Sequence, residues 1–164
     1  MNIQSAREAY RRFFLYLGSI RLIPHFLLWR ASRNRHLIDQ DVARWRLAFL
    51  RRWGESSLTR AFFILMLHNR SFRNVYYDRI GPARILVRFL CPPLPLLDLV
   101  CPKIGPGLVI QHGYATIILA DEIGSNCWIN QQVTIGSGGG SSGIPTLGNN
   151  VGVGAGAKVL GPIK

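Results

Sequence analysis

A six-residue spacing of aliphatic side chains in the last sixty residues constrains the fold more than any other feature. Small residues, above all Gly and Asn, separate the periodic positions, which are Ile104, Ile110, Ile117, Ile123, Ile129, Ile135, Leu147, Val153 and Val159. A short fixed period of this kind is typical of a parallel β-helix built from hexapeptides, in which three hexads form one triangular coil. The periodic side chains then point inward and stack from coil to coil. This class winds left-handed, against the usual right-handed rule for parallel connections.

Two interruptions break the period. The first adds one residue between Ile110 and Ile117, in QHGYAT. The second runs from Ile135 to Leu147, in IGSGGGSSGIPT, where Ser141 stands in place of the expected aliphatic residue. We expect this polar, Gly-rich stretch to leave the coil as a flexible loop. Since loops that leave a rigid scaffold commonly carry function, the interruptions are where functional residues are expected.

The composition changes near residue 100 of the 164. The first hundred residues hold 17 arginines, six acidic residues, all eight phenylalanines and three glycines, whereas the remainder holds three lysines, two acidic residues and 14 glycines. The first part has the caps and apolar periodicity of helices. The sequence therefore predicts an α+β fold, with an α-helical region over 1–95 followed by a left-handed parallel β-helix over 96–164.

Helix starts and stops divide the first region. The first predicted helix runs from Ser5 to Leu17, and the second is limited or kinked by Pro24 and ends near Trp29 and Arg30. The third is capped by Asp39 or Asp41 and carries Val42, Trp45, Phe49 and Trp53 on one face. Three more are predicted over 58–67, capped by Ser56 or Ser57, over 71–80 and over 83–90. The run Cys91-Pro92-Pro93-Leu94-Pro95 ends regular helix.

Several classes of function are disfavoured. Three scattered cysteines without a C-x-x-C motif indicate reduced thiols in a cytoplasmic protein, with neither a disulfide framework nor a zinc site. Charged residues near the N-terminus exclude a signal peptide, and no uncharged apolar run reaches the roughly 18–20 residues of a spanning helix. The net charge of +12 comes from arginines spread over every helix, so neither nucleic acid nor a membrane surface is the expected partner.

Three blocks carry a family resemblance: KIGPGLVIQH, INQQVTIG with its following Gly-rich loop, and VGAGAKVLG. In order and spacing they resemble the serine O-acetyltransferases of the hexapeptide acyltransferase superfamily, from about His68 to Lys164. The resemblance implies transfer of acetyl from acetyl-CoA to L-serine, giving O-acetylserine for cysteine biosynthesis. It also implies a homotrimer, with a dimer of trimers as a further option. We expect no metal, because the sequence has no Cys/His cluster at ligand spacing.

The resemblance implies that His112 is the general base, because an imidazole with a pKa near about 6.5 can take the proton of a hydroxyl as it attacks. Asp98 is the candidate for the carboxylate that orients the base, although this match requires a one-residue deletion before Lys103. A loop aspartate without that role is an equal alternative. Gln111 is a candidate for binding the acceptor, or a plain corner residue.

For acetyl-CoA, the resemblance places the pantetheine arm in a groove between subunits. Gly136 and Gly138 open the loop beside this groove. Gly154, Ala155 and Ala157 are small enough for close backbone approach, and Lys158 can meet the CoA phosphates. Corner geometry and surface charge are the alternative explanations for each of these residues.

Two departures from the family affect the acceptor. Gln111 stands where the family commonly has Asp, and Ser142-Gly143-Ile144-Pro145 lacks the Arg-His pair of the full-length enzymes. The alternatives to serine transfer are therefore transfer to a sugar or another small hydroxyl compound, and a scaffold without catalytic activity. The chain ends at Lys164 on a hexad boundary, so we expect either a truncated chain or an unusually short protein.

Overall fold

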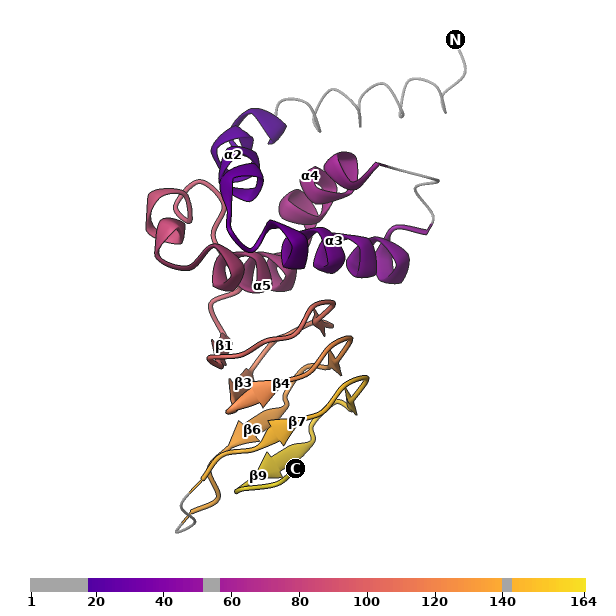
Figure 1. Ribbon diagram of the computed structural model, residues 1–164, viewed down its shortest axis with the longest axis vertical. Coiled ribbons are helices and arrows are strands. Elements are labelled where there is room, and N and C mark those ends of the chain that lie inside the picture. Colours follow the sequence, from indigo (N-terminus) through magenta and orange to yellow (C-terminus); the bar gives the residue numbers. More distant parts are fainter. Residues whose placement is uncertain (1–17, 52–56, 140–142) are drawn as a thin grey trace.

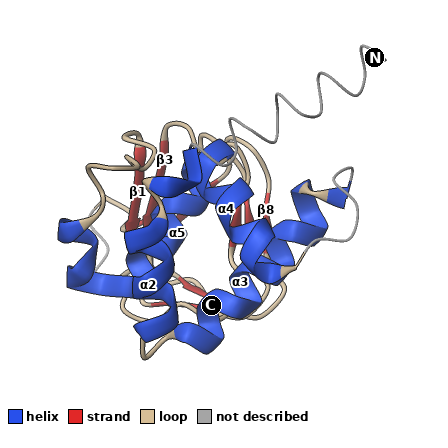
Figure 2. Cartoon of the chain, turned by 90° about the horizontal axis from the view of Figure 1, so that it is seen from above, coloured by secondary structure: helices blue, strands red, loops and turns tan. Residues whose placement is uncertain are grey.

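Helices and coil occupy opposite ends of an elongated molecule. The structure is a computed structural model, and it describes residues 18–51, 57–139 and 143–164. Figure 1 shows the helices at one end and the strands stacked beneath them, and Figure 2 shows the same helices lying over the end of the coil. The helices are α2 (Ile23–Ala31), α3 (Arg35–Phe49), α4 (Leu58–His68), α5 (Arg70–Ile80) and the 3-10 helix η2 (Gly81–Leu86). The helix predicted from Ser5 to Leu17 lies outside the described residues, and so do three single residues named above, Trp53, Ser56 and Ser141.

Two predicted helix starts are confirmed by local chemistry. Pro24 occupies the first turn of α2, where its missing N–H costs no hydrogen bond. The Ser57 hydroxyl accepts a hydrogen bond from the backbone N–H of Arg60 at 3.2 Å and so caps α4. The α5 helix begins one residue earlier than predicted, because the Asn69 side chain caps it by accepting from the N–H of Phe72 at 3.0 Å.

Two other helix predictions are wrong. Neither Asp39 nor Asp41 caps a helix, since α3 already begins at Arg35 and contains both residues. Asp41 is instead buried and pairs with a distant arginine. The α-helix predicted over 83–90 is the 3-10 helix η2, which ends at Leu86.

The strands after residue 96 form three parallel sheets that the chain visits in turn. The first sheet holds β1 (Leu97–Val100), β3 (Thr116–Leu119), β6 (Thr134–Gly136) and β9 (Lys158–Leu160). The second holds β4 (Glu122–Ile123) and β7 (Thr146–Leu147), with Ile104 bridged to Ile123. The third holds β2 (Val109–Ile110), β5 (Trp128–Ile129) and β8 (Gly152–Val153). We call them sheets A, B and C; the order A, B, C repeats along the chain, as in a three-sided coil.

The predicted inward columns are confirmed on two sheets and corrected on the third. Sheet B stacks Ile104, Ile123 and Leu147, and sheet C stacks Ile110, Ile129 and Val153, as the period predicts. On sheet A the column is Leu99, Ile118, Ile135 and Val159. Ile118 is fully buried, whereas the predicted Ile117 is 49% exposed. The first interruption therefore adds two residues rather than one. The spacing from Ile118 to Ile123 is one residue shorter than the usual six. It therefore offsets one of the two inserted residues when the period is counted along the sequence.

Positive backbone φ angles recur at equivalent corners of the coil. Before sheet C they fall at Gly107, Asn126 and Asn150, and before sheet A at Ala115, Gln132 and Gly156, with φ between 51° and 78°. Gly and Asn tolerate this left-handed conformation best, which explains their frequency between the aliphatic positions. The second interruption leaves the coil without adding a turn, because Leu147 pairs directly with Ile123 of the preceding coil.

A buried ion pair joins the helices to the first coil. The Arg79 guanidinium on α5 binds the Asp41 carboxylate on α3 through Nε at 2.8 Å, and the two side chains are 4% and 2% exposed. The same guanidinium donates to the backbone carbonyls of Ile104 and Gly105, each at 2.6 Å. Asp41 in turn accepts from the N–H of Gly107 at 2.7 Å. Both charges are thus hydrogen-bonded on several sides, as a buried pair requires.

Apolar contacts continue across the same junction. The indole N–H of Trp45 donates to the carbonyl of Leu108 at 2.7 Å, so α3 lies directly on the strand entering sheet C. Buried side chains of the helices and of the coil form one continuous hydrophobic cluster. The helical layer therefore closes the first coil and covers its open end.

Replacing Arg79 tests the junction. Arg79→Met leaves the Asp41 carboxylate buried without its cation and leaves two carbonyls without donors. We expect the free energy of unfolding to fall by about 3–5 kcal/mol in denaturant titrations. The control is Arg35→Met, which removes the partly exposed 3.8 Å pair with Asp39 and should change stability by less than about 0.5 kcal/mol. Equal losses in both variants would contradict the assigned role of Arg79.

Acid should weaken the helical layer through His25. Its Nε2 lies 2.9 Å from the Tyr77 hydroxyl, which donates to the carbonyl of Cys91, while the buried Nδ1 has no hydrogen-bond partner among the described residues. Burial lowers the pKa of His25 from 6.5 to about 4. Between these values the unfolded chain binds the extra proton, so the free energy of unfolding falls as the pH falls from 6.5 to 4.

A pair of histidine variants measures this contribution. Across that pH range the wild type should lose about 3 kcal/mol more stability than His25→Leu in denaturant titrations. His36→Leu, which removes an exposed histidine, should keep the wild-type slope. Parallel curves for the wild type and His25→Leu would show that His25 is not the responsible group.

Candidate functional site

The two extra residues form a turn at the corner between sheets C and A, and His112 lies in it. The φ angle of His112 is 62°, and that of Gly113 is 33°. Ala115 also has a positive φ, as do the equivalent corner residues of the later coils. The N–H of Tyr114 donates to the carbonyl of His112 and closes the turn. The His112 side chain is exposed. A non-glycine residue held in this conformation is a recurrent feature of functional sites.

Helix α5 packs against this turn without room for a further side chain. A Cβ atom added at Gly113 would lie 2.7 Å from the Ser71 hydroxyl and 3.0 Å from Leu97. The backbone beside His112 is therefore held by the helical layer as well as by the coil. Ser71 was not singled out from the sequence, and no local pattern connects it with residue 113.

A polar network leads from β5 to the imidazole. The indole N–H of Trp128 donates to the side-chain oxygen of Gln111 at 3.1 Å and is shared with that of Asn130 at 3.3 Å. The Gln111 amide nitrogen lies 3.5 Å from Nε2 of His112. Trp128 and Asn130 were missed in the sequence. A signal was present, because Gln111 follows Ile110 as Asn130 follows Ile129, and these two isoleucines are paired in register.

Asp98 lies on the outer face of sheet A. It is exposed on β1 and pairs in register with Ile117, whose side chain also faces outward. Within the described parts of the chain, no hydrogen bond or ion pair links Asp98 with His112. The two residues belong to the same coil, one on sheet A and the other at the corner that leads into the next strand of this sheet.

The candidate acetyl-CoA residues lie along the two edges of sheet A. Gly154, Ala155 and Ala157 belong to the third-coil corner between sheets C and A, the corner that carries His112 in the first coil, and Lys158 begins β9 beside it. At the opposite edge Gly136 ends β6, and Gly138 lies in the loop that follows. A Cβ at Gly154 would meet no atom within 4 Å, so the backbone there is open to close approach. The Lys158 amine donates to the carbonyl of Gln132 at 3.1 Å and to the Thr134 hydroxyl at 2.9 Å.

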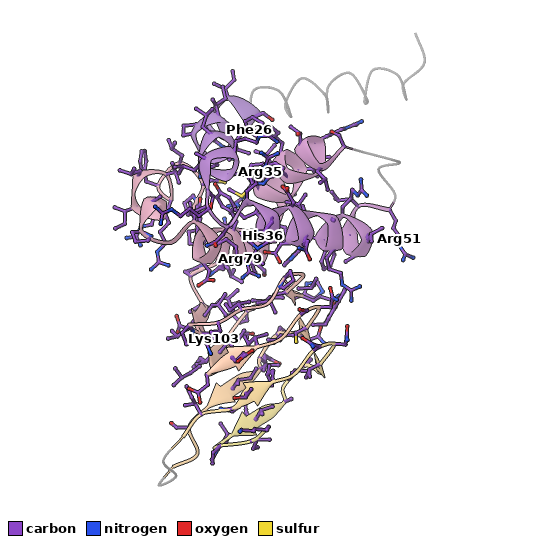
Figure 3. All side chains as sticks on the ribbon, in the orientation of Figure 1. Phe26, Arg35, His36, Arg51, Arg79 and Lys103 are labelled. Atoms are coloured by element: carbon purple, nitrogen blue, oxygen red, sulfur yellow. The ribbon has the colours of Figure 1, made fainter. Side chains whose placement is uncertain are left out.

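A separate cleft of about 490 Å³ lies where the helices meet sheet B. Its lining includes Asn34, Asp78, Arg79, Lys103 and Glu122. Figure 3 shows Arg79 between the helices and the coil and Lys103 on the coil below it. Burial raises the pKa of Asp78. None of the predicted site residues lines this cleft, so it is distinct from the His112 corner.

Metal and thiol chemistry find no support in the part of the chain that the structure describes. It contains no group of three or more His, Cys, Asp or Glu side chains arranged to hold a metal ion. Burial raises the pKa of all three cysteine thiols, which disfavours the thiolate form needed of a nucleophile. Among the described helices, none has both the length and the apolar character required to traverse a bilayer.

The C-terminal part of this α+β chain is similar in sequence to serine acetyltransferases. Serine acetyltransferases of Synechococcus elongatus, Helicobacter pylori and Staphylococcus aureus are 51%, 53% and 48% identical to it over 64 or 65 residues. These stretches are 37–38% of this chain and 27%, 37% and 30% of those relatives, so the chain matches well under half of their length. The resemblance of the C-terminal part to the serine acetyltransferase family is thereby confirmed. No family model matches the chain.

The fold is also similar to that of a solved serine acetyltransferase structure. The crystal structure of Neisseria gonorrhoeae serine acetyltransferase in complex with serine matches 79% of this chain and 56% of its own, with a TM-score of 0.57 and 20% identity. At this identity the likeness concerns the fold. It extends the comparison beyond the repeat region, because 79% of the chain includes part of the helical layer.

Substitution at Gly113 tests how tightly the turn is held. Gly113→Ala should lower the free energy of unfolding by about 1–3 kcal/mol, because the new methyl group meets the Ser71 hydroxyl and the φ is positive. Gly148→Ala is the control, since a Cβ there meets nothing within 4 Å, and its effect should stay within about 1 kcal/mol. If denaturant titrations find the two variants equally stable, the turn is not packed as described.

Proposed function

We propose that the chain is a serine O-acetyltransferase, which converts acetyl-CoA and L-serine to O-acetyl-L-serine and CoA, with His112 as general base. The observation that carries the proposal is the position of His112. It lies in the turn inserted into the first coil, where the helical layer packs against the adjacent Gly113. The 48–53% identity of the C-terminal part to serine acetyltransferases supports the same reaction.

The proposed step balances in atoms and charge. The serine hydroxyl oxygen attacks the thioester carbonyl carbon while His112 takes the hydroxyl proton, since an imidazole near neutral pH suits this task. The tetrahedral intermediate collapses as the C–S bond breaks, and the imidazolium returns its proton to the departing thiolate. Backbone N–H groups are the proposed donors to the oxyanion. Binding both substrates in one ternary complex removes much of the entropic part of the barrier.

The remaining site residues have proposed roles in the same complex. Gly154, Ala155 and Ala157 would allow close approach of the pantetheine arm, with Gly136 and Gly138 at the start of the second loop. Lys158 would meet a CoA phosphate with the donor that its two present hydrogen bonds leave unused. Asp98 would orient the base and Gln111 would contact the acceptor. We further propose that the chain divides into regions 1–95 and 96–164, that the coil winds left-handed, and that the enzyme works in the cytoplasm.

A partly exposed apolar column supports the proposed homotrimer. On the outer face of sheet A, Val100, the half-buried Leu119 and Leu160 lie along one register line that also passes through the buried Gly136, and Val100 and Leu160 are 57% and 43% exposed. Ile117 extends this surface. A neighbouring subunit on this face would bury the column and complete a groove beside His112. The dimer of trimers would then form through the helices.

A second acceptor class has an observation of its own. The side chain next to the base is an amide, Gln111, whose oxygen is already bonded to the indole of Trp128. An amide attracts the serine ammonium less than a carboxylate does, and the loop end Gly143-Ile144-Pro145 offers no charged side chain to serine. Transfer from acetyl-CoA to a sugar or another small hydroxyl compound is therefore the alternative.

An acetyl-CoA turnover assay separates these possibilities. The purified chain should release CoA with L-serine, and His112→Ala should lower kcat by about 10²–10⁴-fold, the usual contribution of a general base. His36→Ala, at an exposed helix residue, should retain full activity. CoA release only with a sugar acceptor would favour the alternative. No release with serine, homoserine or sugars would favour a scaffold without catalytic activity.

A further inference from the structure

The orientation of the Gln111 amide is determined by its neighbour. An indole N–H can donate a hydrogen bond and cannot accept one. The Trp128 N–H lies 3.1 Å from the Gln111 side chain, so the amide oxygen must face the indole. The amide NH₂ group then faces away from Trp128. It lies 3.5 Å from Nε2 of His112, a separation that can shorten when substrates enter a catalytic site.

This orientation favours one neutral form of the imidazole. The Gln111 NH₂ group has only protons to offer, so the ring nitrogen that faces it must supply a lone pair. In the neutral ring this requires Nε2 to be unprotonated and Nδ1 to carry the hydrogen. A carboxylate in place of Gln111 would accept a proton from Nε2 and favour the opposite form. The amide at this position thus favours the form in which Nε2 carries the lone pair, and the acceptor hydroxyl has to replace the Gln111 N–H there before the proton moves.

The indole that orients the amide is itself held from several sides. Trp128 lies on β5 between β2 and β8, with its backbone in register with Val109 and Gly152. Its ring lies 5.9 Å from that of Phe49 at the end of α3. The side chain of Asn130 shares the indole N–H at 3.3 Å. The helical layer therefore contacts the same indole that orients Gln111.

We propose that Trp128 and Gln111 are positioning residues that set the tautomer of His112, with Nε2 unprotonated and ready to take the proton of the acceptor hydroxyl. This inference rests on the proposed function for its catalytic meaning, but the tautomer itself is a property of the protein without substrate. The acceptor hydroxyl displaces the Gln111 N–H from the lone pair of Nε2, and its proton then moves to this nitrogen. The Gln111 N–H regains this lone pair when the imidazolium passes the proton to the thiolate of CoA.

Nitrogen NMR of ¹⁵N-histidine-labelled protein tests the tautomer directly. The full chain is measured about two pH units above the ordinary histidine pKa of about 6.5, and His112 is assigned by its loss in His112→Ala. In the wild type, Nε2 of His112 should appear as the unprotonated nitrogen. Trp128→Phe, which keeps a ring beside Phe49 but has no N–H, should shift the population toward the form protonated on Nε2. Gln111→Leu should do the same.

Asn130→Ala is the matched control. It removes the second acceptor of the indole and leaves the bond to Gln111, so the tautomer should remain as in the wild type. A wild-type ring protonated mainly on Nε2 would overturn the inference without any variant. An unchanged tautomer in folded Trp128→Phe and Gln111→Leu would overturn it as well.

Steady-state kinetics distinguish a failure of this inference from a failure of the proposed function. In the acetyl-CoA assay, Gln111→Leu and Trp128→Phe should lower kcat by about tenfold, because only part of the base is in the competent form. KM for acetyl-CoA should stay unchanged. If the wild type transfers no acetyl group, the proposed function fails while the NMR result still stands or falls by itself. If it is active and both variants keep the wild-type kcat, the positioning role is excluded.

Discussion

The ion pair between Asp41 and Arg79 is the interaction on which the rest of the arrangement depends. A stack of parallel coils has an open first turn, with backbone groups and apolar side chains that must be covered. Arg79 covers it by donating to two carbonyls of this turn, and Asp41 by accepting from a third residue in it. The two helices that carry the pair, α3 and α5, are the same helices that reach the His112 corner through Phe49 and Ser71. Stability of the joint and placement of the candidate base therefore have a common structural origin.

Among the described residues of the helical layer, the two buried arginines have structural roles. Arg79 donates to two carbonyls of the first coil, and Arg73 donates to the carbonyls of Met66, Leu67 and Pro92 at 2.6–2.8 Å. Both side chains end on backbone groups where helices or coil terminate, which is a task suited to the five donors of a guanidinium. These contacts account for part of the basic composition without a polyanionic partner. The candidate site residues, by contrast, lie in the nearly neutral repeat region.

Periodic features of the structure could be predicted from the sequence, and contacts between distant residues could not. Eight of the nine periodic aliphatic positions lie on the inward columns, because one side chain per hexad must fill the coil. The prediction for Ile117 was wrong because a two-residue insertion before it and a one-residue shortening after it partly cancel in the six-residue spacing. The start of α3 was predicted too late because Asp is a common N-cap residue, whereas Asp41 pairs with Arg79, 38 residues away in the sequence. His112 was predicted as a candidate from its motif and stays a prediction. Ser71 contacts the turn from a helix and has no local pattern, whereas the register of Ile110 with Ile129 pointed to the strand that carries Trp128.

In the proposed reaction, the turn that packs against α5 presents His112 to the hydroxyl of a bound acceptor. A crystal structure of the chain with CoA and L-serine measures this directly, through the distance from Nε2 of His112 to the serine hydroxyl oxygen. We expect a separation of about 2.6–3.2 Å, with the Gln111 amide still bonded to the indole of Trp128. Serine bound at another place, or with its hydroxyl out of reach of this nitrogen, would contradict the proposed reaction.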